Sequence, residues 1–203
     1  MSAVLTTRLK ITDLTAETAL ETGRALLPEG VSLDRLVREE LYLFEPAPGH
    51  AATAFEAPLE RAIESSNFFV NPNKERYRFL KSAARGDSIR LPDGAWGILA
   101  RSREDTRDGV LLERLLREHP LPGLGAIRRA RVWWLWTNGP RGGASIEACH
   151  AALGPVEGAR RGLLTNPHAE ASLLLDGPLP WARVEEFLSQ DEVERASTQR
   201  SDR

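Results

Sequence analysis

The stretch that decides the fold is Ser65-Ser-Asn-Phe-Phe-Val-Asn-Pro-Asn-Lys-Glu-Arg-Tyr-Arg-Phe-Leu80, because a weaker copy of it returns as Gly162-Leu-Leu-Thr-Asn-Pro-His-Ala-Glu-Ala-Ser-Leu-Leu-Leu175. In each copy, bulky apolar residues precede an Asn-Pro pair, at Asn71-Pro72 and at Asn166-Pro167. Asn before Pro disfavours a continuing helix and starts a turn, so both copies predict a helix that ends and turns into a strand. The pairs are 95 residues apart, which indicates an internal repeat.

A long apolar-rich segment precedes each Asn-Pro pair, at residues 33–45 and 126–137. Aligning Leu36 with Ile127 gives an offset of 91 residues, close to the first offset. The same alignment places Arg38 opposite Arg129. Two landmarks in the same order favour a duplication over two unrelated helix-turn-strand segments.

The composition is that of a globular intracellular protein. The 203 residues are 41% hydrophobic, with a net charge of −2 and a pI near 6.1, so there is no overall attraction to nucleic acid or to anionic membrane. A single cysteine, Cys149, excludes an internal disulfide and a multi-cysteine metal site. The sequence shows neither a signal-peptide pattern nor the roughly 18 apolar residues of a spanning helix, so we expect a cytoplasmic protein without membrane association.

Hydrophobic periodicity predicts the order strand, helix, strand, helix, strand, and then the same order again. Asp13 or Thr15 is the expected N-cap of the first helix, and the segment 33–45 is either one bent strand or a hairpin turning near Glu39-Glu40. The expected elements are strands at 7–12, 33–45, 77–80, 95–100, 126–137 and 171–175, and helices at 16–27, 55–63, 108–118, 145–153 and 180–195.

This order predicts an α+β protein of two tandem ferredoxin-like units, each an antiparallel sheet with helices on one face. The expected division is a first unit at 1–82, a linker at 83–95, a second unit at 96–176, and a C-terminal helix with a disordered tail at 177–203. The C-terminal helix either seals the second unit or docks a partner, and the short closing strand favours sealing. The side chains expected to be mostly buried are Tyr42, Phe44, Phe69, Phe79, Trp134, Trp136 and Leu164.

The motifs resemble those of the small PurS-type subunit of bacterial phosphoribosylformylglycinamidine synthase. The first resemblance is Val37-Arg-Glu-Glu-Leu-Tyr-Leu-Phe-Glu45, which is similar to the family's Val-Arg-x-Gly-Lys-Tyr-x-Glu-Leu strand. The second is Phe68-Phe-Val-Asn-Pro72 and its strand, similar to the family's Leu-Leu-Ala-Asn-Pro segment, and residues 162–170 repeat it. Members of that family have about half this length and dimerise, so the chain resembles a covalent version of the dimer.

The resemblance implies a subunit without catalytic residues or a cofactor of its own. Such a subunit bridges the glutaminase and the ATP-dependent synthetase that convert FGAR to FGAM in purine biosynthesis, and it helps ammonia to pass between them. Its expected partners are those two proteins, and further self-association stays open.

No set of residues in the sequence converges on catalysis or metal binding. Cys149 and His150 are adjacent on a helix and point about 100° apart, so they do not form a thiolate and base pair. The histidines lack ligand spacing, and Pro140-Arg-Gly-Gly143 fits a surface loop rather than a phosphate-binding loop. We therefore expect no catalytic, cofactor-binding or metal-binding residue.

Three arginines and three tryptophans share the segment 126–137, and RNA-recognition modules stack bases on such a sheet. Strand alternation places Trp134 and Trp136 on one face and Trp133 on the other, both faces being apolar. This pattern and the acidic balance favour packing against a partner or a second sheet over RNA binding. A ligand-sensing module with a metabolite between the two units is a further alternative. The candidate interface residues are Arg38, Tyr42, Arg129, Trp133 and Trp134.

Overall fold

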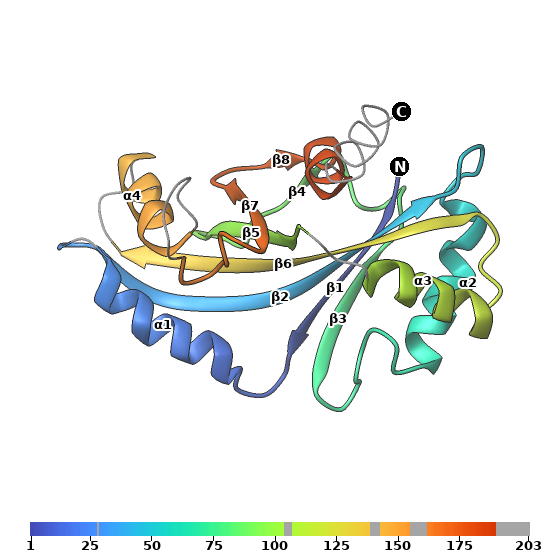
Figure 1. The fold of residues 1–203 in the computed structure, drawn as a ribbon, viewed down its shortest axis with the longest axis horizontal. Helices are drawn as coiled ribbons and strands as arrows, with labels where there is room; N and C mark the ends of the chain where they lie inside the picture. The colour runs from blue at the N-terminus through green and yellow to red at the C-terminus, as the bar shows by residue number, and fades with distance from the viewer. Residues whose placement is uncertain (28, 104–106, 139–142, 155–161, 190–203) are drawn as a thin grey trace.

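The computed structural model describes residues 1–27, 29–103, 107–138, 143–154 and 162–189. Apart from two short strands at 88–89 and 179–180, which were not predicted, strands and helices follow one another in the predicted order (Figure 1). The elements are β1 Ala3–Leu9, α1 Leu14–Leu26, β2 Ser32–Pro46, α2 Thr53–Ser65, β3 Glu75–Leu80, β4 Ser88–Ile89, β5 Trp96–Ser102, α3 Arg107–Glu118, β6 Leu124–Asn138, α4 Gly143–Leu153, β7 Glu170–Leu175 and β8 Leu179–Pro180. A further helical stretch covers 181–189.

Six strands form one antiparallel sheet in the order β3-β1-β2-β6-β5-β7. The central strands β2 and β6 have 15 residues each, and they pair from Ser32 opposite Asn138 to Pro46 opposite Leu124. Figure 1 shows these two strands crossing the length of the molecule. The chain is therefore an α+β protein in which both halves contribute to a single sheet.

The segment around Glu39-Glu40 is continuous strand and not a hairpin. Glu39 lies opposite Val132 and Glu40 opposite Arg131, in the middle of the β2–β6 ladder. No Gly, Pro, Asn or Asp stands there to provide the backbone angles of a tight turn, so nothing interrupts the pairing. Of the two alternatives that the sequence left open, the long strand is correct.

Two hydrophobic clusters lie on the same face of the sheet, one under each pair of helices. Leu36 packs with α1 and α4, whereas Phe44 packs with α2 and α3. These two residues are an even number of positions apart on an uninterrupted part of β2, so their side chains point to the same side. The helix pairs α1/α4 and α2/α3 lie at opposite ends of the sheet (Figure 1).

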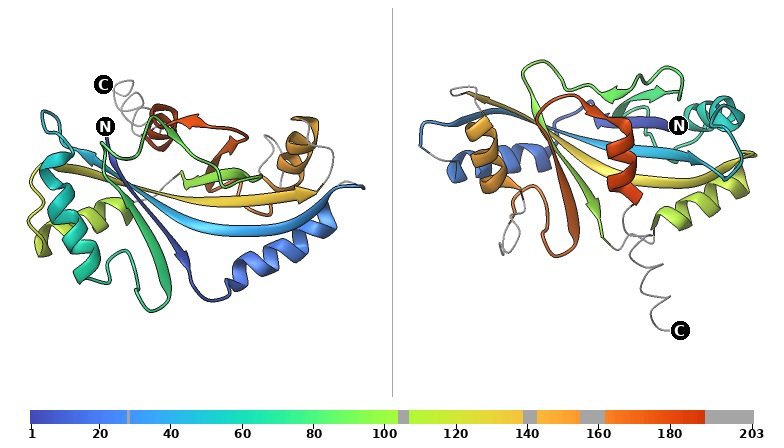
Figure 2. Two further views of the ribbon diagram at one scale, coloured as in Figure 1. Left: turned by 180° about the vertical axis from the view of Figure 1, so that it is seen from behind. Right: turned by 90° about the horizontal axis from the view of Figure 1, so that it is seen from above.

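The other face of the sheet is covered by the 181–189 helix and by the two-stranded ribbon β4–β8 (Figure 2). Trp181, Val184, Phe187 and Leu188 of this helix are buried, as its predicted apolar stripe requires. They belong to one cluster with side chains of β1 and β2 as well as of β6 and β7. The helix therefore seals central strands from both halves of the chain, and not the second half alone.

The two Asn-Pro turns have the same hydrogen bonds. The backbone N–H of Asn71 donates to Glu75 Oε2 at 2.6 Å, and that of Asn166 donates to Glu170 Oε2 at 2.7 Å. In both turns the residue after proline donates its N–H to the asparagine Oδ1 at 3.1 Å. Each turn lies between a helix and an edge strand, β3 or β7, as the repeated motif predicts.

Some expected boundaries differ. The first strand begins at Ala3 and ends at Leu9, because Ala3, Val4 and Leu5 are fully buried while Ile11 is exposed. The expected linker at 83–95 contains β4, which pairs with β8 and so joins the segment to the C-terminal region. The tail at 197–203, the end of the helix predicted at 180–195, and residues 140–142 of the predicted loop lie outside the described residues.

The expected core residues are all at least half-buried. Phe44, Phe69, Trp134 and Leu164 are buried, and Tyr42, Phe79 and Trp136 are half-buried. Within the described ranges, no helix combines the length and the apolar character that crossing a membrane requires.

Phe69 is the residue whose truncation best tests this core. Its ring meets Tyr42 edge-on at 5.2 Å and Phe44 at 5.3 Å, and 5% of its surface is exposed. Phe69→Ala should lower the free energy of unfolding by about 3–5 kcal/mol, because it removes an aromatic core side chain and leaves a cavity. Urea denaturation measures this loss. Tyr77→Ala, at a ring that is 41% exposed, is the matched control and should cost much less; equal losses would contradict the assignment.

Candidate functional site

A row of charged side chains crosses the helix-bearing face between the two hydrophobic clusters. Arg38 and Glu40 of β2 and Arg129 and Arg131 of β6 all point to this face. Glu40 lies directly opposite Arg131, whereas Arg38 lies opposite Trp133 and Arg129 opposite Tyr42. Carboxylates from the helices complete the row. We call this set the central ion-pair row: Asp13, Arg38, Glu40, Asp108, Arg129 and Arg131.

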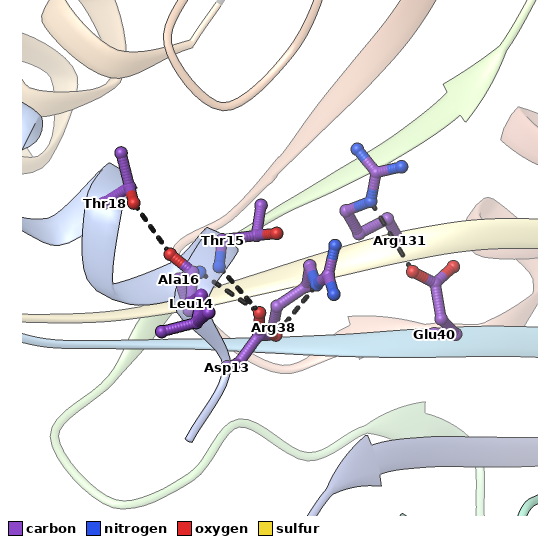
Figure 3. Close-up of polar contacts among 8 residues, drawn as sticks. All are labelled: Asp13, Leu14, Thr15, Ala16, Thr18, Arg38, Glu40 and Arg131. Carbon is purple, nitrogen blue, oxygen red and sulfur yellow. Dashed lines mark hydrogen bonds and ion pairs between the residues drawn. The ribbon is translucent and has the colours of Figure 1, made fainter. Parts of the chain in front are cut away.

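Asp13 links the start of α1 to β2. It is the N-cap of α1, and its Oδ1 accepts hydrogen bonds from the backbone N–H groups of Thr15 at 3.1 Å and Ala16 at 3.3 Å. Its Oδ2 accepts from Arg38 Nε at 2.9 Å, as Figure 3 shows. One carboxylate thus satisfies the helix end and fixes the guanidinium over the strand.

Asp108 makes the corresponding link in the second half. It lies in the first turn of α3, and its two oxygens accept from the backbone N–H and from Nε of Arg129. Asp13 and Asp108 are 95 residues apart, and Arg38 and Arg129 are 91 apart, which are the offsets of the sequence landmarks. The two ion pairs therefore occupy matching places in the two halves.

Glu40 and Arg131 lie opposite each other in the middle of the β2–β6 ladder, and Figure 3 shows their side chains next to each other. Arg131 Nε lies 3.6 Å from Glu40 Oε1, and its Nη1 lies 3.6 Å from Glu170 Oε1. Burial raises the pKa of Glu40, and the positive charges of Arg131 and Arg38 oppose that rise. Burial, with a contribution from Glu40, raises the pKa of the neighbouring Tyr42 to about 12, so its hydroxyl stays protonated at neutral pH.

A cavity of about 1010 Å³ lies beside Arg131, between α1, β6 and the segment 162–170. Trp133 and Glu170 also line it. Trp133 Nε1 and Thr165 Oγ1 are buried, and neither has a hydrogen-bond partner within the described part of the chain. Residues from both halves of the sequence therefore meet at this cavity.

The predicted interface residues do not share one surface. Arg38 and Arg129 lie in the row with partly exposed side chains, and Tyr42 packs edge-on against Phe69. Trp133 is buried on the helix-bearing face and Trp134 on the opposite face, where its Nε1 donates to Glu39 Oε2 at 2.9 Å. Both indoles are therefore core residues on opposite faces of the sheet, and they do not form one stacking surface.

Burial shifts the pKa values of Cys149 and His150, the adjacent pair on α4. The thiol of Cys149 is buried, and burial raises its pKa, which disfavours the thiolate. Burial lowers the pKa of His150, whose Nε2 has no hydrogen-bond partner among the described residues. In the same part of the chain, no three His, Cys, Asp or Glu side chains come close enough to hold a metal ion.

Four members of the row were not predicted as site residues: Asp13, Glu40, Asp108 and Arg131. Asp13 was expected only as a helix cap, and a single charged residue on a strand or at a helix start looks like a solvent-facing one. The signal that identifies them is the repeat itself. An offset of 91 brings Glu40 onto Arg131, and an offset of 95 brings the cap Asp13 onto Asp108.

No protein-family model, no curated protein and no solved structure matches the chain significantly. Any statement about function therefore rests on the motifs of the chain itself and on the arrangement of its residues.

The pKa of Glu40 tests the electrostatics of the row. Replacing Arg131 by Gln should raise this pKa further, because it removes the largest of the charges that oppose the effect of burial. An acid whose pKa is higher in the folded than in the unfolded state stabilises the fold at low pH, and this stabilisation is lost as the pH rises through the folded pKa. In the variant, the stabilisation from Glu40 should therefore persist to a higher pH. Carboxyl ¹³C NMR titration measures the shift. Arg183→Gln, at an exposed site on the 181–189 helix, is the control; a Glu40 pKa that does not move with Arg131→Gln would contradict the arrangement.

Proposed function

We propose that the chain is a covalent, tandem form of the PurS-type dimer, and that it acts as a bridging subunit without catalysis of its own. In this role it holds the glutaminase and the ATP-dependent synthetase of phosphoribosylformylglycinamidine synthase together while ammonia passes between them. The proposal combines the sequence resemblance with the way the two halves of the chain correspond.

The observation that carries the proposal is the correspondence of the halves about the Glu40–Arg131 pair. The sheet has matching strands on the two sides of its centre: β2 corresponds to β6, β1 to β5, and β3 to β7. The matching Asn-Pro turns and the matching ion pairs, Asp13–Arg38 and Asp108–Arg129, follow the same relation. Two copies of one βαβαβ unit joined through their long strands would produce this pattern.

A bridge needs two separate surfaces, and the chain exposes two sets of large apolar side chains. Ile11 and Leu14, before and at the start of α1, are 59% and 76% exposed. Val110 and Leu116 of α3 are 64% and 42% exposed. The two helices lie towards opposite ends of the sheet (Figure 1). We assign the two docking contacts to these two sets, one from each half.

The functional test is glutamine-dependent FGAM formation by the synthetase and glutaminase, with and without this protein. Glutamine-dependent turnover should rise when the protein is added, because ammonia must then travel only within the complex. Turnover with added ammonium salt should hardly change, since free ammonia needs no bridge. If the rate of glutamine-dependent turnover is the same with and without the protein, and no complex forms in size-exclusion chromatography, the purine-synthase proposal is wrong.

Paired surface variants separate the two contacts. Ile11→Ser/Leu14→Ser and Val110→Ser/Leu116→Ser should each release one partner and retain the other in a pull-down assay. Tyr77→Ser, at an aromatic ring of similar exposure on β3, is the matched control and should retain both. Loss of both partners with either pair would indicate general destabilisation rather than two docking surfaces.

The cavity beside Arg131 favours a second candidate, a ligand-sensing module. It lies between residues of both halves and carries charges of both signs, from Arg131 and Glu170, together with apolar lining residues. This is the composition of a small-molecule site. The ligand-sensing function takes precedence if the chain forms no complex with either purine-synthesis partner.

A further inference from the structure

A second, smaller cavity lies on the face opposite α1–α4 and belongs to neither proposal above. It encloses about 220 Å³ between the sheet and the segment 84–90 that follows β3. At about 30 Å³ per water molecule, this volume corresponds to about seven waters. Its apolar lining comes from the sheet and from the start of the 181–189 helix, and consists mainly of Val4, Leu41, Leu80, Val132, Trp134 and Trp181.

The charged residues around this cavity are mostly arginines. Arg78, Arg85 and Arg90 line it together with one acid, Glu39. Glu39 is already engaged, because it accepts from Trp134 Nε1 at 2.9 Å and lies 3.9 Å from Arg8. Arg78 and Arg90 are exposed, and neither forms an ion pair with any described residue. The cavity lining thus carries two positive charges that pair with no acid among the described residues.

Arg85 carries a third guanidinium within this buried region. Its side chain is 3% exposed, and its Nη1 pairs with Glu185 Oε1 at 2.8 Å. Its Nε is buried and has no hydrogen-bond partner in the described part of the chain, and the same is true of Trp181 Nε1, whose ring lies 5.2 Å from the guanidinium. Buried donors left without acceptors cost free energy, so two donors next to one cavity indicate an acceptor that binds there.

The residues at this cavity differ from those at the matching positions of the second half. Thr6 lies opposite Leu41, and Arg78 lies opposite Thr6. Their counterparts in the second half are Leu99, opposite Val132, and Leu173, opposite Leu99. Leu99 and Leu173 pack in the cluster that the 181–189 helix covers. The first half therefore has Thr6 and Arg78 where the second half has leucines, and it is in the first half that this face holds a cavity instead of a helix.

We propose that this cavity binds a small organic anion. Its phosphate or carboxylate group would be held by Arg78 and Arg90, with Arg85 Nε and Trp181 Nε1 as further donors, and its compact apolar body would lie over Leu41 and Trp134. Guanidinium groups suit oxyanions because their planar donors match two oxygens at once. The site is separate from the surfaces assigned to the bridging function, so either proposal can fail without the other.

The test uses the intrinsic fluorescence of the full chain, because Trp134 and Trp181 both line the cavity. Inorganic phosphate, phenyl phosphate and benzoate are titrated at constant ionic strength set with chloride. We expect saturable changes, with phenyl phosphate or benzoate binding more tightly than inorganic phosphate because of the apolar floor. Tighter binding of phenyl phosphate would identify the natural ligand as a phosphate, and tighter binding of benzoate would identify it as a carboxylate.

Arg78→Gln/Arg90→Gln should weaken this binding by about tenfold or more, the factor that corresponds to losing one charge-assisted hydrogen bond. Arg61→Gln/Arg117→Gln, at exposed arginines on α2 and α3, removes the same charge away from the cavity and should leave binding unchanged. Thr6→Leu, which introduces the residue of the matching position, should reduce binding by filling the cavity. Titrations without saturation for every probe, or equal losses in both double variants, would overturn the proposal.

Discussion

The pairing of β2 with β6 is the constraint on which the rest of the structure depends. These strands are the only ones long enough to extend under both helix pairs among the described elements, and every other strand of the main sheet is placed by its distance from them. The pairing of residues 40 and 131 at the middle of the ladder fixes which side chains face which helices. A slip of one residue would move Arg38 and Glu40 into the apolar cluster of the opposite face, and would move Leu41 and Leu43 to the helix-bearing face.

The charged row between the two hydrophobic clusters follows from the length of these strands. Helices of 13 residues or fewer cover only the two ends of a 15-residue strand pair, since a residue advances the chain about 1.5 Å in a helix and about 3.4 Å in an antiparallel strand. The uncovered middle accommodates charged side chains, and the helix starts supply carboxylates to them. Asp13 satisfies the free N–H groups of α1 and the guanidinium of Arg38 at once, so the position of the helix and the charge of the strand depend on each other.

The sequence predicted the element order well, because amphipathic periodicity and Asn-Pro turns are local signals. The turns at Asn71 and Asn166 carry their own hydrogen bonds within five residues, which is why they can be recognised without the fold. The continuity of β2 through Glu39-Glu40 could not be decided locally, because it depends on a partner strand some 90 residues away. For the same reason Trp133 and Trp134 looked like interface residues, since only the packing of helices on both faces shows that they are core. The cavity near Arg85 depends on segments far apart in the chain, and no local pattern indicates it.

The residues at the centre of the β2–β6 ladder have a consequence for symmetry. In a pair of identical chains related by a two-fold axis, a residue on the axis faces its own copy, so a glutamate there meets a glutamate and an arginine meets an arginine. Such like-charge contacts oppose association. In this chain the axial positions hold Glu40 and Arg131, so the contact is attractive and its two sides are chemically distinct. One polypeptide can therefore carry a junction that no homodimer could build, and each half becomes free to acquire surfaces that the other half lacks.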